Sequence, residues 1–97
     1  MTQTATPPKE RERAGRGDRT GDAWRVIVLN DSHNTFEGVA AALARTIPEI
    51  DFTKGMRLAN AIHFRGQAVV WTGHRELAEH YHGKLGGEGL TLAPLEC

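Results

Sequence analysis

The pattern of apolar and polar residues divides the chain into blocks, and each block predicts one structural element. The first block, residues 24–29 (WRVIVL), is apolar and rich in β-branched residues, which favours a strand. The polar segment 30–34 (NDSHN) follows, and each of its residues can cap a helix or form a turn. Beyond it, apolar residues recur at helical spacing and predict a helix that ends near Pro48. The apolar stripe of this helix is Phe36, Val39, Ala40, Leu43 and Ile47.

Polar residues indicate where the helices begin. Asn34 stands three residues before Glu37, so we expect the pair to form a capping box at the start of the first helix. Asp51 is the expected cap of a second helix that runs to about Ile62. Gly55 in its interior lowers the stability of this helix by up to ~1 kcal/mol relative to Ala. Its apolar positions are Phe52, Met56 and Ala59 on one face, with Leu58 and Ile62 beside them.

Two more strands and a third helix complete the pattern. Residues 67–72 (QAVVWT) predict the second strand, and the third helix is expected to open at Thr72 or Gly73 and to end at Gly86-Gly87. The order β-α-α-β-α-β predicts an α+β fold, in which a small three-stranded, mostly antiparallel sheet packs against three helices. The apolar face of the third helix is Leu77, Tyr81 and Leu85, and the last short strand is marked by Leu90, Leu92 and Leu95.

Composition divides the chain into two parts. Residues 1–23 contain no Val, Leu, Ile, Phe, Tyr or Trp and are rich in Pro, Gly and charged residues. Such a segment cannot bury enough apolar surface to offset the entropy lost on ordering, so we expect a disordered N-terminal arm. The arm also lacks the apolar stretch of a signal peptide. Residues 24–97 are expected to form one domain.

Charge and cysteine content argue against several classes of function. Twelve basic and twelve acidic residues give a formal net charge of zero, so we expect no nucleic-acid partner. No apolar run approaches the ~20 residues needed to cross a bilayer, so we expect no membrane association. The single cysteine, Cys97, cannot form an intramolecular disulfide, which suits the cytoplasm. We expect a cytoplasmic monomer without a cofactor.

Neither a metal site nor a catalytic site is indicated. His74, His80 and His82 do not share one helix face, and no Cys or carboxylate spacing completes a zinc site. Asp31 and His63 could be drawn as an acid and a base, but no nucleophile lies beside a base. The ~74 residues outside the arm leave little room for a substrate cleft and a lid. We therefore expect a binding protein and not an enzyme.

The polar end of the first strand offers the most specific chemistry. Asn30 and Asp31 directly follow this strand, and His63 comes at the end of the second helix. Taken singly, each has an ordinary interpretation, Asn-Asp as a turn and His as a helix cap or a surface residue. Together, their amide, carboxylate and imidazole could converge as acceptors on an ammonium group, which is a cation with up to three donors.

With the residues around it, this cluster resembles the ClpS adaptor family, which hands substrates to the Clp ATP-dependent protease. The resemblance covers about residues 24–95. It implies capture of N-degron substrates, whose free α-amine and bulky apolar first residue (Leu, Phe, Tyr or Trp) are bound and delivered to a Clp AAA+ unfoldase. The motifs that carry it are Val28-Leu29-Asn30-Asp31, Phe36-Glu37, Val39, His63-Phe64-x-Gly66-Gln67-Ala68-Val69 and Glu76-Leu77-Ala78-Glu79.

The resemblance assigns roles by position. Asn30, Asp31 and His63 would bind the α-amine. The apolar side-chain pocket would be lined by Phe36, Val39, Ala59, Ile62 and Leu90. Ser32 stands where the family has a second Asp, and Asn34-Thr35-Phe36 stands in place of Thr-Pro-Met, so Ser32, Asn34 and Thr35 would form an altered pocket rim. Ala59 stands where a large Met is common, which would enlarge the pocket.

The third helix would carry the docking site for the N-terminal domain of a ClpA- or ClpC-type unfoldase. Glu76 matches a position that the family uses for docking, and Tyr81 falls where a Lys is usual. The departures from the family pattern leave two alternatives open. The chain could be a Clp-docking or scaffold domain with an altered or silent degron pocket. It could also be a domain like that of the ribosomal stalk, although such a domain has no reason to carry the acceptor cluster.

Overall fold

The computed structural model describes residues 24–97, and the arm expected at residues 1–23 lies outside the described residues. The observed order is the predicted β-α-α-β-α-β, which confirms the α+β fold class. Within residues 24–97, no helix is long and apolar enough to cross a membrane. The elements are β2 (Trp24–Leu29), α1 (Phe36–Thr46), α2 (Phe52–Arg65), β3 (Gln67–Gly73), α3 (Arg75–Gly87) and β4 (Thr91–Leu92).

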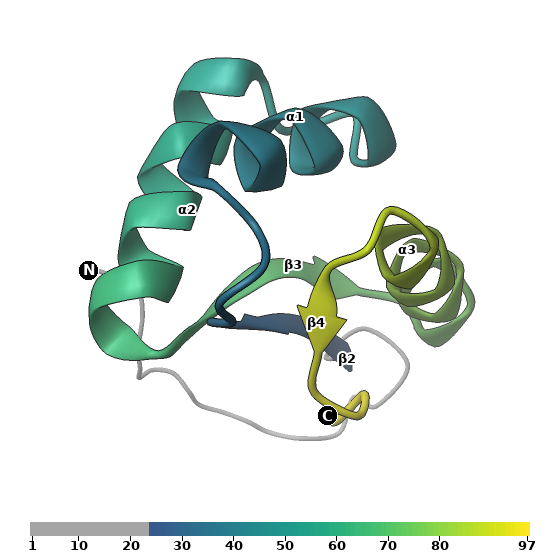
Figure 1. Cartoon of the computed structure of the whole chain (residues 1–97). Helices are drawn as coiled ribbons and strands as arrows, with labels where there is room; N and C mark the ends of the chain where they lie inside the picture. The colour runs from purple at the N-terminus through teal and green to yellow at the C-terminus, as the bar shows by residue number, and fades with distance from the viewer. Residues whose placement is uncertain (1–23) are drawn as a thin grey trace.

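The sheet is antiparallel and β2 is its middle strand, in the order β3-β2-β4. Figure 1 shows the three helices on one face of this sheet, with α1 and α2 next to each other. Between β2 and β3 the register shifts, because Val26 pairs with Trp71 whereas Ile27 pairs with Val69. Val70 is therefore an extra residue in β3, a bulge that bends the strand.

The core lies between the sheet and the helices. Val26 and Val28 of β2 are fully buried in one cluster with Leu43 of α1, Ile47 just after α1 and Leu85 of α3. The C-terminal end of β2 is flanked on both sides, because Leu29 pairs with Gln67 of β3 and with Thr91 of β4. The polar segment that begins at Asn30 leaves the sheet from this point.

The helix starts differ in part from the prediction. Asp51 caps α2 as predicted, and its side chain accepts a hydrogen bond from the backbone N–H of Lys54 at 2.7 Å. The capping box at Asn34 is wrong by one residue, because Thr35 caps α1 and accepts from the N–H of Gly38 at 2.9 Å. The third helix begins at Arg75 with His74 as its cap, because Thr72 and Gly73 still belong to β3.

The buried faces of α2 and α3 also differ from the predicted ones. Phe52 is 50% exposed, and the buried residues of α2 are Gly55, Ala59 and Ile62. Gly55 is buried because the two helices touch there: a Cβ atom at this position would lie 2.7 Å from the carbonyl oxygen of Ala40 in α1. On α3, Leu77 is 47% exposed, whereas Ala78, Tyr81 and Leu85 are buried.

Candidate functional site

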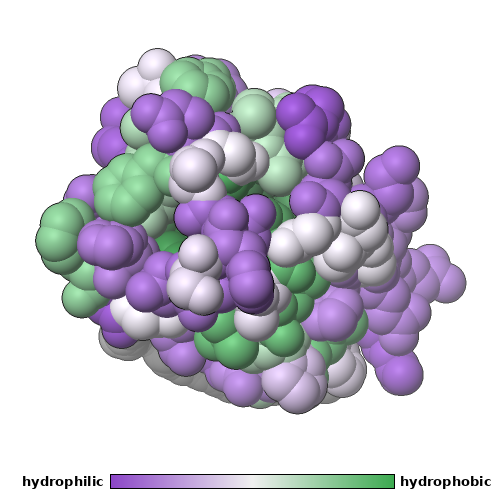
Figure 2. All heavy atoms as spheres, in the orientation of Figure 1, coloured by the Kyte–Doolittle hydropathy of each residue, from purple (hydrophilic) through white to green (hydrophobic). Residues whose placement is uncertain are grey.

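A pocket of about 200 Å³ opens where the end of β2, the start of α1 and the C-terminal half of α2 meet. An engineered apolar cavity of about 150 Å³ holds benzene, so this pocket has room for one large side chain. In the orientation of Figure 1, Figure 2 shows apolar atoms at depth between polar side chains. The pocket is lined by Asn30, Asp31, His63, Phe36, Val39, Ala59, Ile62 and Leu90, together with Val28, Leu29, Asn34 and Thr35.

The eight residues predicted for amine binding and for the apolar pocket therefore all line one pocket. Val39, Ala59, Ile62 and Leu90 are buried and supply an apolar interior. Of the three predicted rim residues, Asn34 and Thr35 line the pocket, whereas the exposed Ser32 does not. Val28 and Leu29 were missed, because as strand residues they were assigned to the sheet alone.

The backbone of Asn30 is fixed against the end of α2. Its N–H donates to the carbonyl oxygen of Gly66 at 2.8 Å. Gly66 ends α2 with a positive φ of 91°, a left-handed conformation that residues with a side chain rarely adopt. This hydrogen bond joins the end of β2 to the end of α2, and Asn30 and His63 line the same pocket.

The carboxylate of Asp31 is fully occupied by donors of the protein. Its Oδ1 accepts from the N–H groups of His33 at 2.8 Å and Asn34 at 2.9 Å. Its Oδ2 accepts from Nδ2 of Asn34 at 2.9 Å and from the hydroxyl of Thr91 at 2.8 Å. A carboxylate has about four lone-pair sites, and these donors match that number. The oxygens of Asp31 thus hold the loop, and direct acceptance from an amine by Asp31 stays a prediction.

These hydrogen bonds keep Asp31 ionised. The bond from the backbone N–H of Asn34 is the largest cause, and those from Thr91, the Asn34 side chain and the His33 N–H add to it. Together they hold the pKa of the Asp31 carboxyl well below its usual range, against the opposing effect of partial burial. Asp31 therefore places a permanent negative charge at the pocket.

The loop before β4 closes the pocket from the other side. The Asn34 side chain donates not only to Asp31 but also to the carbonyl oxygen of Gly89 at 3.0 Å, and an ion pair joins Arg45 of α1 to Glu88. The bonds from Asn34 and Thr91 hold residues 89–91 against the segment 31–34, and the ion pair holds Glu88 against α1. Leu90 is thereby fixed in the pocket wall, although it precedes β4 and is not part of that strand.

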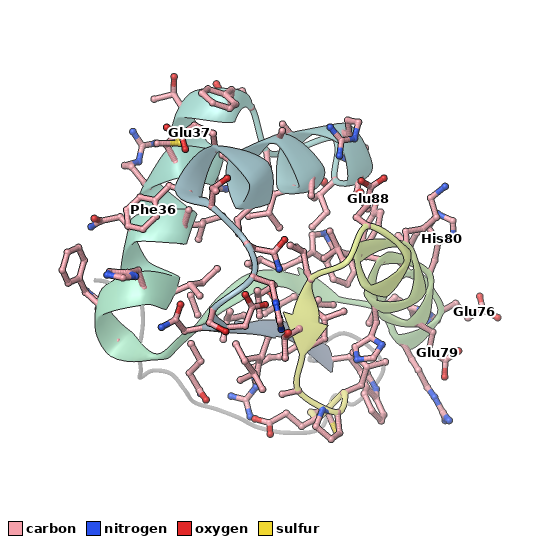
Figure 3. The ribbon with its side chains drawn as sticks, viewed as in Figure 1. Phe36, Glu37, Glu76, Glu79, His80 and Glu88 are labelled. Carbon is pink, nitrogen blue, oxygen red and sulfur yellow. The ribbon has the colours of Figure 1, made fainter. Side chains whose placement is uncertain are left out.

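His63 stands between two phenylalanines at the pocket. Its ring centroid lies 5.0 Å from that of Phe36, and 4.7 Å from that of Phe64 in an edge-to-face contact. In Figure 3, Phe36 reaches from the start of α1 toward α2. Among residues 24–97, no group hydrogen-bonds to the His63 ring or to the Asn30 side chain, and both residues are exposed. These two side chains are therefore available as acceptors at the pocket.

The two docking residues predicted on α3 differ in their exposure to solvent. Glu76 is exposed, and Figure 3 shows it pointing away from the sheet together with Glu79 and His80. Tyr81 is only 8% exposed, because its ring packs edge-to-face on Trp71 with centroids 5.0 Å apart. Tyr81 is therefore a core residue, and it cannot offer its ring to a partner.

Residues 24–97 contain no group of three or more His, Cys, Asp or Glu side chains placed to hold a metal ion. The three histidines weighed for that role are separated by the fold. His74 caps α3 through Nδ1, which accepts from the N–H of Glu76 at 3.3 Å. His82 is hydrogen-bonded through Nε2 to the carbonyl oxygen of Ala93 at 2.9 Å, and His80 is exposed next to Tyr81.

Comparison with protein families gives a match over the whole described region. The family of the ATP-dependent Clp protease adaptor protein ClpS matches residues 19–97. Curated adapter proteins ClpS are similar over most of their length. That of Thermosynechococcus vestitus is 46% identical over 89 residues, which cover 92% of this chain and 93% of that protein. That of Nostoc sp. is 43% identical over 94 residues, which cover 97% of this chain and 94% of that protein.

Comparison with solved structures supports the fold. The structure of Agrobacterium tumefaciens ClpS2 bound to L-phenylalaninamide matches with a TM-score of 0.72. The match covers 79% of this chain and 98% of that one at 24% sequence identity. The likeness extends to the whole α+β architecture that positions the pocket.

Proposed function

The chain belongs to the ClpS family of adaptor proteins for the ATP-dependent Clp protease, and we propose that its pocket captures N-degron substrates. In this proposal the bulky apolar first residue of a substrate enters the pocket, while Asn30 and His63 accept hydrogen bonds from its free α-amine. The observation that carries the proposal is that two exposed acceptors without partners among residues 24–97 stand beside an apolar pocket of about 200 Å³. An adaptor of this kind delivers its substrate and does not itself catalyse cleavage.

The chemistry of the site selects a free N-terminus. A charged α-amine offers up to three donors, and charge-assisted hydrogen bonds of this kind are worth ~1.5–3 kcal/mol each. Asp31 lines the same pocket, and its ionised carboxylate attracts the cation. An internal peptide bond has no such charge and only one N–H to donate. It would leave one of the two acceptors, Asn30 or His63, without a donor, so the site rejects it.

The apolar pocket selects the first side chain. Burying a Leu or Phe side chain there contributes ~1.5–3 kcal/mol, since Val39, Ala59 and Ile62 replace its contact with water. Ala59 leaves space at the base of this pocket, which favours large residues. The ligand of the similar ClpS2 structure, L-phenylalaninamide, combines an apolar ring with an amine and so has the chemistry that this pocket fits.

The alternative function is a Clp-docking or scaffold domain whose pocket binds no N-degron. The open pocket argues against this alternative. No side chain of residues 24–97 fills the space between Asn30, His63 and Ala59. The two are distinguished by titrating the full chain with peptides that differ only in their first residue. Micromolar binding of peptides that begin with Phe, Leu, Tyr or Trp, and none of one that begins with Ser, supports capture. No response to any of them, with retained binding to a Clp unfoldase, would establish the docking-only alternative.

We further propose that the Clp AAA+ unfoldase docks its N-terminal domain on the outer face of α3. Glu76 is exposed on that face with Glu79 and His80. Glu76→Arg should weaken capture of the adaptor by the N-terminal domain of a ClpA- or ClpC-type unfoldase at least tenfold. Glu49→Arg, which reverses an exposed charge away from α3, is the matched control. Equal weakening by both variants would contradict docking through Glu76.

For the setting, we propose that the adaptor works in the cytoplasm as a monomer. Cys97 is exposed and unpaired, which suits a reducing compartment. Sedimentation of the full chain at micromolar concentration tests the monomer, because a dimer would double the mass.

A further inference from the structure

The outer face of α2 carries an apolar and basic surface that the pocket does not use. Phe64 is 71% exposed and Phe52 is 50% exposed, one at each end of the helix. They border a shallow trough of about 840 Å³. Figure 2 shows apolar side chains standing on the surface over α2. The trough is lined by Phe52, Thr53, Met56, Arg57, Asn60, Ala61, Phe64 and Arg65, which we call the α2 trough.

The charged residues of α2 are all basic. The helix contains Lys54, Arg57 and Arg65 but no Asp or Glu. Elsewhere in the described region, Arg25, Arg45 and Arg75 each form an ion pair with a Glu. No carboxylate of residues 24–97 lies within ion-pair distance of the three cations of α2. An occupant of the α2 trough would therefore best be acidic, with apolar side chains to cover Phe52 and Phe64.

The α2 trough adjoins the pocket at one point, although no residue of the described chain lines both. Phe64, at its C-terminal end, contacts the ring of His63 edge-to-face, and His63 lines the pocket. Phe64 and Phe52 are twelve residues apart, which is about 18 Å along the helix axis. An extended peptide spans that distance with about five or six residues. A substrate whose first residue fills the pocket can therefore lay its next residues along α2.

We propose that the α2 trough is an extended substrate subsite, which binds the segment behind the N-degron residue and prefers acidic side chains there. This inference rests on the proposed function, because it needs the first residue in the pocket. The arm at residues 1–23 is a poor occupant, since it has no large apolar side chain beyond Met1 and its four acidic residues are outnumbered by five basic ones. Arg57, midway along α2, is the central cation of the subsite.

The test compares three peptides that all begin with Phe and have a free amine. They differ at positions three to seven. The acidic peptide has acidic and apolar residues there, the Gly-Ser peptide has Gly and Ser, and the basic peptide has basic and apolar residues. The acidic peptide should bind the full chain roughly three- to tenfold more tightly than the Gly-Ser peptide, because each exposed ion pair is individually weak. This preference should shrink at high salt, where exposed charges are screened.

Arg57→Glu should abolish or reverse the acidic preference and leave binding of the Gly-Ser peptide unchanged. Lys84→Glu is the matched control, since it reverses an exposed cation on α3 that also has no ion pair among residues 24–97. Circular dichroism of each variant checks that it folds. Retention of the preference in Lys84→Glu and its loss in Arg57→Glu together support the subsite.

Other outcomes would overturn the inference in distinct ways. Equal binding of the three peptides would remove the subsite but leave the proposed function intact. Equal binding of the acidic peptide and its N-acetylated form would show an acidic-peptide site independent of the pocket. Binding to anionic phospholipid vesicles that Arg57→Glu abolishes, without any peptide preference, would identify a membrane-facing surface instead. If none of the three peptides binds, the proposed function and this inference fall together.

Discussion

The hydroxyl of Thr91 donates to the carboxylate of Asp31 at 2.8 Å, across sixty residues of sequence. This bond joins the loop that follows β2 to the strand β4 that ends the fold. Because Asn34 also bonds to Gly89, the two segments are held together at two points. The pocket wall that contains Leu90 therefore depends on a polar contact and not on apolar packing alone.

Thr91→Val removes this donor and keeps the shape of the side chain. It should lower the free energy of unfolding by about 0.5–1.5 kcal/mol, as for one hydrogen bond, and weaken binding of a peptide that begins with Phe. Thr91→Ser, which keeps the hydroxyl, is the control and should retain both properties. Urea unfolding and peptide titration measure them, and a Thr91→Val protein indistinguishable from Thr91→Ser would refute the role of the bond.

The stability of the domain should depend on Asp31 in acid. The pKa of this carboxyl is lowered in the fold, so it lies below the unfolded value of about 3.9. The stability it contributes is thus complete above that value and is lost as the pH falls toward the folded pKa. We expect the wild type to lose about 1–2 kcal/mol more than Asp31→Asn between about pH 5 and 2, after allowance for solvent screening. Equal pH slopes in urea unfolding would contradict this account.

Gly55→Ala should destabilise the protein although Ala is the better helix former. The added Cβ would lie 2.7 Å from the carbonyl oxygen of Ala40, so α1 and α2 must move apart at a cost of about 1–3 kcal/mol. Gly83→Ala is the matched control, since nothing lies within 4 Å of a Cβ there and α3 should gain about 0.5–1 kcal/mol. Thermal unfolding separates the two, and a stabilised Gly55→Ala would disprove the close contact.

Filling the pocket at Ala59 should change which first residues bind. Ala59→Met adds three heavy atoms to a pocket of about 200 Å³, so affinity for peptides that begin with Trp should fall at least tenfold, and more than for those that begin with Leu. Ala44→Met adds the same volume to α1 outside the pocket lining and should leave both affinities unchanged. Unaltered Trp binding by Ala59→Met would place the side-chain pocket elsewhere.

Much of this fold could be predicted because its elements have distinct periods. The β-branched run at 24–29 and the helical spacing after Phe36 each favour one structure, so element types and order follow from them. The buried faces were harder, because helical periodicity shows which apolar residues align but not which face meets the core. Phe52 aligns with Ala59 in the sequence, yet it is half exposed, while Gly55 forms the contact with α1.

The pocket residues could be predicted because the motifs at the ends of β2 and α2 carry the resemblance to the ClpS family, and the resemblance assigned the apolar lining by position. The hydrogen bonds that occupy the Asp31 carboxylate could not all be predicted, since its partner Thr91 is sixty residues away and has no local sequence signal. The burial of Tyr81 depends likewise on Trp71, a contact between α3 and β3. Such tertiary contacts decide whether a polar or aromatic side chain faces a ligand or supports the fold.

The central claim is that Asn30 binds the free α-amine of a substrate, and a cycle of two changes tests it most directly. One change acetylates the N-terminus of a peptide that begins with Phe, and the other is Asn30→Ala. Loss of one charge-assisted hydrogen bond corresponds to roughly a 10- to 150-fold change in Kd. The account predicts that acetylation weakens binding to the wild type at least tenfold and to Asn30→Ala far less. An equal effect of acetylation on both proteins would contradict it.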